Sequence, residues 1–129
     1  MPDPSCPAPV VRPRLRVLLG DEIALGPGKV ALLGAIAEHG TLAEAAKRLG
    51  MSYMRAWRLV QTMNACFAHP LVATARGGAQ KGQAALTPEG EAVLGLYRRM
   101  EAASLEALEP AWQELLPYLA EKPPAADLS

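Results

Sequence analysis

The 129-residue chain has few cysteines and no long apolar run, and these absences exclude several classes of protein. Its two cysteines, Cys6 in a proline-rich leader and Cys66 in a helical pattern, lie in unlike settings and do not indicate a disulfide framework. No apolar stretch approaches the roughly 18 residues that span a bilayer, and the first residues lack the apolar core of a signal peptide. The sequence therefore predicts a cytoplasmic protein with no membrane partner.

The sequence also lacks a motif that would carry catalysis. It contains no recognisable nucleophile and base pair, no phosphate-binding glycine loop and no metal-ligand motif. Met63, Cys66 and His69 follow one another at three-residue spacing and could suggest a soft-metal site. Because Met63 falls on an apolar helical seam, Cys66 can be a small buried apolar residue and His69 precedes a proline, core packing is the preferred interpretation. We expect no enzyme activity, no metal and no cofactor.

A net charge is absent too, but the charges are unevenly distributed along the chain. Residues 41–88 hold six basic side chains and one acidic, which leaves +5, whereas residues 89–129 hold three basic and eight acidic, which leaves −5. The first forty residues balance at four of each sign. The middle segment can therefore face phosphates, while the C-terminal part faces solvent or a second subunit.

Three short helices are expected before residue 70. Apolar residues at three-to-four spacing indicate a first helix that Gly40 stops, and Thr41 with Glu44 fits the capping box of a second. Ser52 is a good N-cap for a third helix. The expected buried positions of the second helix are Leu42, Ala45, Ala46 and Leu49, and those of the third are Ala56, Val60, Met63 and Phe67.

Two hairpins and a C-terminal helical region complete the pattern. A first hairpin is expected within residues 14–25 and a second, a wing, within residues 71–86 around a glycine-rich turn at 76–82. Thr87 and Pro88 begin a further helix, which Pro110 is expected to interrupt. Its expected apolar seam is Val93, Leu96, Tyr97, Met100 and Ser104, and a second apolar patch follows at Trp112, Leu115, Leu116 and Leu119.

These elements predict a mainly α fold with a small β-wing, which is a winged helix-turn-helix. We expect a disordered leader at 1–13, a DNA-binding domain at 14–86, C-terminal dimerisation helices at 87–121 and a disordered tail at 122–129. The face of the third helix opposite its seam is polar and basic, as in a helix that enters the major groove. Arg55 and Arg58 are the expected base or phosphate contacts, whereas Trp57, beside the seam, is expected to pack in the core. The candidate DNA-binding residues are Thr41, Lys47, Arg48, Ser52, Tyr53, Met54, Arg55, Arg58, Thr62, Arg76 and Lys81.

The same residues resemble a known family, the DNA-binding half of the ModE-type molybdate-responsive regulators, which is related more distantly to the LysR-type helix-turn-helix. The similar positions run from about residue 14 to 110. They are Thr41, Ala45-Ala46-Lys47, Gly50, Ser52-Tyr53, Ala56-Trp57, Met63-Asn64, Leu71-Val72, Gly77-Gly78 and Leu86-Thr87 with Gly90. The resemblance implies double-stranded DNA and a second copy of the chain as partners, and genes of molybdate uptake or molybdenum enzymes as targets.

Two departures from the family pattern limit what the resemblance implies. The wing segment at 81–85 keeps one glycine where the family is typically glycine-rich. Full-length members also carry C-terminal oxyanion-binding domains, which we expect this chain to lack, so we expect no direct binding of molybdate. Two alternatives stay open at this point: a regulator that senses an oxyanion at its dimer interface, and an interaction adaptor that kept the fold without DNA affinity.

Overall fold

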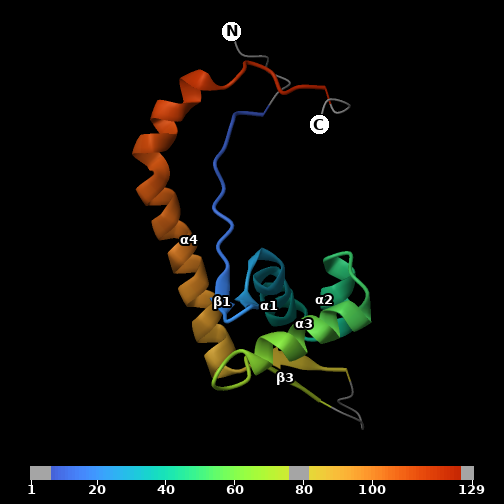
Figure 1. The fold of residues 1–129 in the computed structure, drawn as a ribbon. Coiled ribbons are helices and arrows are strands. Elements are labelled where there is room, and N and C mark those ends of the chain that lie inside the picture. The colour runs from blue at the N-terminus through green and yellow to red at the C-terminus, as the bar shows by residue number, and fades with distance from the viewer. Residues whose placement is uncertain (1–6, 76–81, 126–129) are drawn as a thin grey trace. The chain divides into compact units, whose positions relative to one another are not determined.

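The computed structural model describes residues 7–75 and 82–125, and its mainly helical architecture with two small sheets confirms the expected fold class (Figure 1). Residues 14–101 form one compact unit, and the residues before and after them form another. The elements in chain order are β1 Val17–Leu19, β2 Glu22–Leu25, α1 Pro27–His39, α2 Leu42–Arg48, α3 Tyr53–Ala65, β3 Val72–Thr74, β4 Ala84–Leu86, α4 Pro88–Leu115 and the 3-10 turn η2 Leu116–Tyr118.

The expected N-terminal hairpin is confirmed. Strands β1 and β2 pair antiparallel with a bulge after Val17, and Gly20 takes the left-handed conformation that the turn requires (φ 61°). Ala24 and Leu25 on β2 are buried, whereas Leu18 and Leu19 on β1 are exposed. The hairpin therefore buries apolar surface mainly through the end of β2.

The core of the larger unit lies among α1, α2 and α3, which Figure 1 shows gathered together. Its fully buried side chains include Leu32, Leu33 and Ile36 from α1, Leu42, Ala45 and Ala46 from α2, and Ala56, Val60 and Met63 from α3. The prediction that Leu49 is buried is wrong: the side chain is 36% exposed. The helix ends one residue earlier, at Arg48, so Leu49 lies at the C-cap instead of on the buried face.

The wing strands β3 and β4 pair antiparallel, with Val72 opposite Leu86 and Thr74 opposite Ala84. A further bridge joins β4 to the turn between α1 and α2. Ala84 N donates to Gly40 O at 3.0 Å, and Thr41 pairs with Gln83. The base of the wing is therefore hydrogen-bonded to the residues that begin α2.

The first half of α4 packs within the larger unit through a face rotated from the predicted seam, in which Tyr97 is buried and Val93 partly buried as predicted, but Leu96 is replaced by Leu94. Gly90, Leu94 and Tyr97 are its buried residues, whereas Leu96 and Met100 are 51% and 43% exposed. Both stripes have helical spacing, so periodicity alone did not distinguish them. Tyr97 belongs to both stripes, and its hydroxyl donates to Leu15 O at 2.7 Å.

The prediction that Pro110 interrupts the C-terminal helix is also wrong, since α4 continues through it to Leu115. A proline removes one backbone donor and crowds the carbonyl four residues earlier, here that of Glu106. The flanking turns are rich in alanine, glutamate and leucine, which have high helix propensities and can offset that cost. In the described part of the chain, no helix is both long enough and apolar enough to cross a membrane.

Candidate nucleic-acid interface

The interface begins with the way in which α3 is held at its first turn. Ser52 has an extended backbone, and its Oγ accepts a hydrogen bond from Arg55 N at 3.1 Å. This N-cap satisfies a donor that the helix itself leaves without a partner. The Ser52 hydroxyl keeps its own proton, which is available to an acceptor in solution. The capped turn fixes where the side chains of the following residues emerge.

The polar face of α3 is solvent-exposed, as the sequence predicts, but its candidate residues do not all point the same way. An α-helix advances about 100° per residue, so Met54, Arg58 and Gln61 lie opposite the buried seam. Arg55 and Thr62 lie along one edge of that face, and Thr62 is half-buried. Arg58, and not Arg55, is therefore the cation nearest the centre of the exposed face.

The other edge of α3 carries two aromatic side chains. Tyr53 and Trp57, one turn apart, are 47% and 37% exposed. The prediction that Trp57 packs in the core is therefore wrong, although Ala56 beside it is fully buried. A small cleft of about 70 Å³ lies on this side of α3, and we call it the α3–wing cleft. It is lined by Leu42, Tyr53, Trp57, Thr74, Ala75, Gly82 and Gln83.

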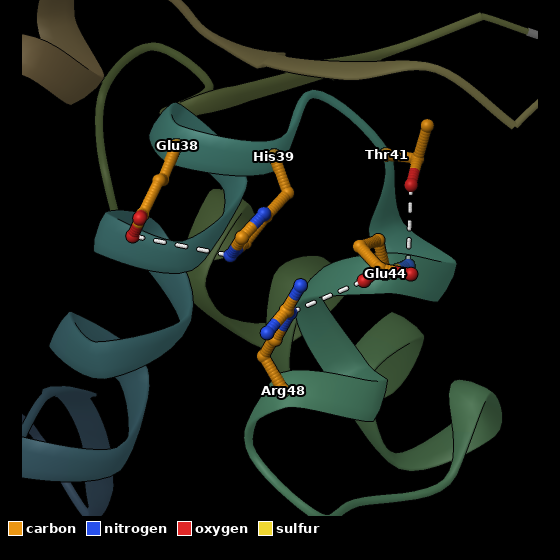
Figure 2. A network of polar contacts seen from close by, with 5 residues as sticks. All are labelled: Glu38, His39, Thr41, Glu44 and Arg48. Atoms are coloured by element: carbon orange, nitrogen blue, oxygen red, sulfur yellow. Dashed lines mark hydrogen bonds and ion pairs between the residues drawn. The ribbon is translucent and has the colours of Figure 1, made fainter.

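The turn into α2 is built from polar contacts that Figure 2 shows. Thr41 Oγ1 accepts from Glu44 N at 3.1 Å, which confirms the predicted N-cap. The Glu44 carboxylate points along the helix instead, where Oε1 accepts from Arg48 Nε at 3.1 Å. In the same view, His39 Nε2 lies 3.9 Å from a carboxylate oxygen of Glu38 at the end of α1.

The two cations of α2 differ in their partners. Lys47 is exposed and has no ion pair within the described residues, whereas Arg48 pairs with Glu44 at a partly exposed site. Surface pairs of this kind contribute about 0.3–0.5 kcal/mol, so a phosphate can displace Glu44 at little cost. Arg76 and Lys81, the other two expected phosphate contacts, lie outside the described residues.

Asn64 joins α3 to the wing, and sequence reasoning missed this role. Its Oδ1 accepts from Leu71 N at 2.9 Å and from Val72 N at 3.1 Å, while its Nδ2 donates to Val72 O at 3.0 Å. The only signal in the sequence was that Asn64 belongs to the family-like pattern. Its amide can match the backbone because it offers both an acceptor and a donor.

A second contact fixes the start of α4 against the wing. The Thr87 hydroxyl donates to Pro70 O at 2.6 Å and accepts from Gly90 N at 3.0 Å. A Cβ at Gly90 would stand 2.1 Å from Leu71 O, so only glycine permits this approach. Together with Asn64, these residues hold the wing in a defined position beside α3.

The residues considered for a metal do not form a site. Met63 is fully buried in the core, Cys66 is half-buried and His69 is exposed. Half-burial of Cys66 departs from the expected burial of its side chain. Over residues 7–75 and 82–125, no group of three histidine, cysteine, aspartate or glutamate side chains could hold a metal ion.

Comparison with known proteins places this geometry in a family. Residues 28–91 match the bacterial regulatory helix-turn-helix protein, lysR family. The molybdenum-pterin-binding protein MopA of Rhodobacter capsulatus is 43% identical over 84 residues, which are 65% of this chain and 32% of MopA. The DNA-binding transcriptional dual regulator ModE of Escherichia coli K12 is 36% identical over 83 residues, which are 64% of this chain and 32% of ModE.

The solved structures agree with that assignment. The CbnR DNA-binding domain in complex with DNA has a TM-score of 0.54 at 25% identity, over 67% of this chain and 94% of that domain. The chain spans about a third of the length of the curated relatives that it matches. Residues 28–91 therefore form a helix-turn-helix domain of the LysR family, and the chain is a relative of the ModE-type proteins.

Proposed function

We propose that the chain is a sequence-specific DNA-binding transcriptional regulator of genes for molybdate uptake or molybdenum enzymes, and that it acts without catalysis. The observation that carries the proposal is the exposed, basic face of α3, held by the Ser52 cap and the Asn64 contacts in a LysR-type domain. The molybdenum part of the proposal rests on the names of the relatives MopA and ModE.

Arg58 and Arg55 are the proposed base readers, because a guanidinium at the major groove can donate two hydrogen bonds to guanine. Tyr53, Met54 and Thr62 border them on α3. The proposed backbone contacts are Thr41, Lys47, Arg48 and Ser52, with Arg76 and Lys81 on the wing segment. Cations contact phosphates without regard to sequence, so this division predicts two different kinds of mutant.

We propose that the DNA-bound form is a homodimer joined through α4. Leu105, Leu108, Trp112 and Leu115 recur at spacings of three and four, as on one side of a coiled coil, and the three leucines are 44%, 37% and 49% exposed. Such a stripe is costly to leave in water. Sedimentation should find a dimer for the intact chain, and Leu108→Lys should convert it to a monomer. A monodisperse monomer of the unaltered chain would contradict the proposal.

The DNA proposal is tested with a duplex selected by the intact chain from a random-sequence library. The selected and a scrambled duplex are compared across a salt series, since sequence-specific binding should persist where counterion-driven affinity fades. Arg58→Ala should lose about 1–3 kcal/mol on the selected duplex and relax one position of each half-site. Arg99→Ala, on α4, is the matched control and should bind normally. Equal affinity for both duplexes at every salt concentration would refute sequence-specific regulation, and no binding to either duplex would favour an adaptor.

A further inference from the structure

We infer that the α3–wing cleft is a neutral phosphate clamp, in which Trp57 and Tyr53 donate hydrogen bonds to the DNA backbone beside the base-reading face. The inference rests on the proposed DNA-binding function. It adds a contact that involves no cation, on the edge of α3 that faces the wing.

The two aromatic side chains bring polar donors to this edge. Within the described residues, neither the indole N–H of Trp57 nor the hydroxyl of Tyr53 has a hydrogen-bond partner. Both rings are about half exposed, and neither belongs to the buried core cluster. Tryptophan and tyrosine have apolar rings with a polar handle, and that handle usually finds a partner when it is desolvated. In the free protein water can supply that partner, and in a complex an acceptor of the DNA can replace the water.

The size and lining of the cleft select the acceptor. About 70 Å³ is well below the roughly 300 Å³ of a pocket for a small organic ligand, so the cleft admits a group of a few atoms and not a base. Among the residues that the structure describes, its lining includes Thr74 and Gln83 and no charged residue. Neutral donors around a small space suit the oxygens of a phosphate, which accept strong hydrogen bonds from uncharged groups.

The position of the cleft on α3 brings it next to the DNA backbone. Trp57 lies about 100° around α3 from Arg58. When Arg58 contacts the bases of one DNA strand, the sugar-phosphate backbone of that strand therefore runs along the side of α3 that faces the wing. The rigid connection through Asn64 and Val72 sets the width between α3 and the wing. The clamp therefore fixes the depth and register of α3 in the groove rather than reading sequence.

A neutral contact has a salt signature that separates it from a cationic one. Each Lys or Arg that neutralises a phosphate adds about 0.9 to the slope of log affinity against log salt, because it releases counterions. An N–H or O–H donor releases none. Trp57→Phe should weaken binding to the selected and scrambled duplexes alike, by about five- to tenfold per half-site, and leave the slope unchanged. Lys47→Ala should lower the slope.

The experiment uses the intact chain and the selected duplex, with single methylphosphonate substitutions that each remove one charged phosphate oxygen. At the clamped phosphate, the substitution should lower the affinity of the unaltered protein. It should add little to the loss of affinity that Trp57→Phe already causes. Tyr53→Phe should behave similarly at the same or the adjacent phosphate. Tyr118→Phe, which removes the same hydroxyl from a residue 89% exposed, is the matched control and should change nothing. Thermal unfolding of each variant checks that it folds.

Three results would overturn the clamp. In the first, Trp57→Phe lowers the affinity by the same factor whichever phosphate carries the methylphosphonate. In the second, Trp57→Phe lowers the salt slope by about 0.9 per contact, as the loss of a cation would. The third is a loss that disappears when deoxyuridine replaces one thymine, since the cleft would then hold the thymine methyl group. If the unaltered chain prefers no sequence but Trp57→Phe still weakens its binding to every duplex with the salt slope unchanged, the proposed regulator fails and the clamp stands. If it binds no duplex, both fail.

Discussion

The strongest test of how the wing is positioned is the substitution Asn64→Ala. It removes three hydrogen bonds, two accepted from Leu71 N and Val72 N and one donated to Val72 O. Leu71 and Val72 are 0% and 3% exposed, so water cannot readily replace the lost amide. Each bond contributes about 1 kcal/mol net, and each buried donor left without a partner costs about 1–3 kcal/mol. The free energy of unfolding should fall by about 3–5 kcal/mol.

Two further variants separate the Asn64 contacts from general effects on α3. Asn64→Asp keeps an oxygen that accepts from Leu71 N and Val72 N but replaces the donor to Val72 O with a carboxylate oxygen, so it should lose stability at neutral pH, though less than Asn64→Ala. Gln61→Ala, on the exposed face of the same helix, should stay within about 0.5 kcal/mol of the unaltered protein.

Urea unfolding followed by circular dichroism provides the measurement. Protein concentration must be held constant, because dimerisation would add to the apparent stability. If Asn64→Ala lost no more than 1 kcal/mol beyond Gln61→Ala, the three hydrogen bonds would not be what holds the wing, and the geometry of the α3–wing cleft would need another cause.

Three other measurements test the packing of Gly90, the burial of Tyr97 and the absence of an oxyanion site. Gly90→Ala should lower the free energy of unfolding by about 2 kcal/mol or more in the same urea assay, because its Cβ would collide with Leu71 O; normal stability would refute the close approach. Burial, with a smaller contribution from Glu101, raises the pKa of Tyr97 against the opposing effect of Arg14. The buried neutral phenol therefore contributes to the free energy of unfolding below pH 10, the ordinary pKa of tyrosine, and this contribution is lost as the pH rises through the higher pKa of the folded protein. Tyr97→Phe should not show this loss. Calorimetry of the chain with molybdate should find no saturable site, since the described residues that line the α3–wing cleft include no cation; sub-micromolar binding would contradict this.

Local features of this protein could be predicted from its sequence because they depend on neighbouring residues. The caps at Thr41 and Ser52 involve a hydroxyl and a backbone N–H three positions away. Gly40 ends α1 with φ at 74°, as a glycine after an apolar seam indicates. The positions Ala56, Val60 and Met63 of the α3 seam follow from helical periodicity in the same way, whereas Phe67, the fourth expected position, lies beyond the end of the helix and is only partly buried. These signals were sufficient for the helix-turn-helix and its exposed basic face.

Only the tertiary structure decided which of two possible apolar stripes is buried and which distant segments pack together. Leu94 and Leu96 both fit a helical stripe that contains Tyr97, whose hydroxyl donates to Leu15 O 82 positions away, and only the packing decided that Leu94 is the buried one. The Asn64 contacts and the bridge from Thr41 to Gln83 likewise join segments whose approach no local pattern encodes. Trp57 became part of a cleft because the wing stands beside α3. Periodicity identifies an apolar face, but only the packing of distant segments determines what covers it.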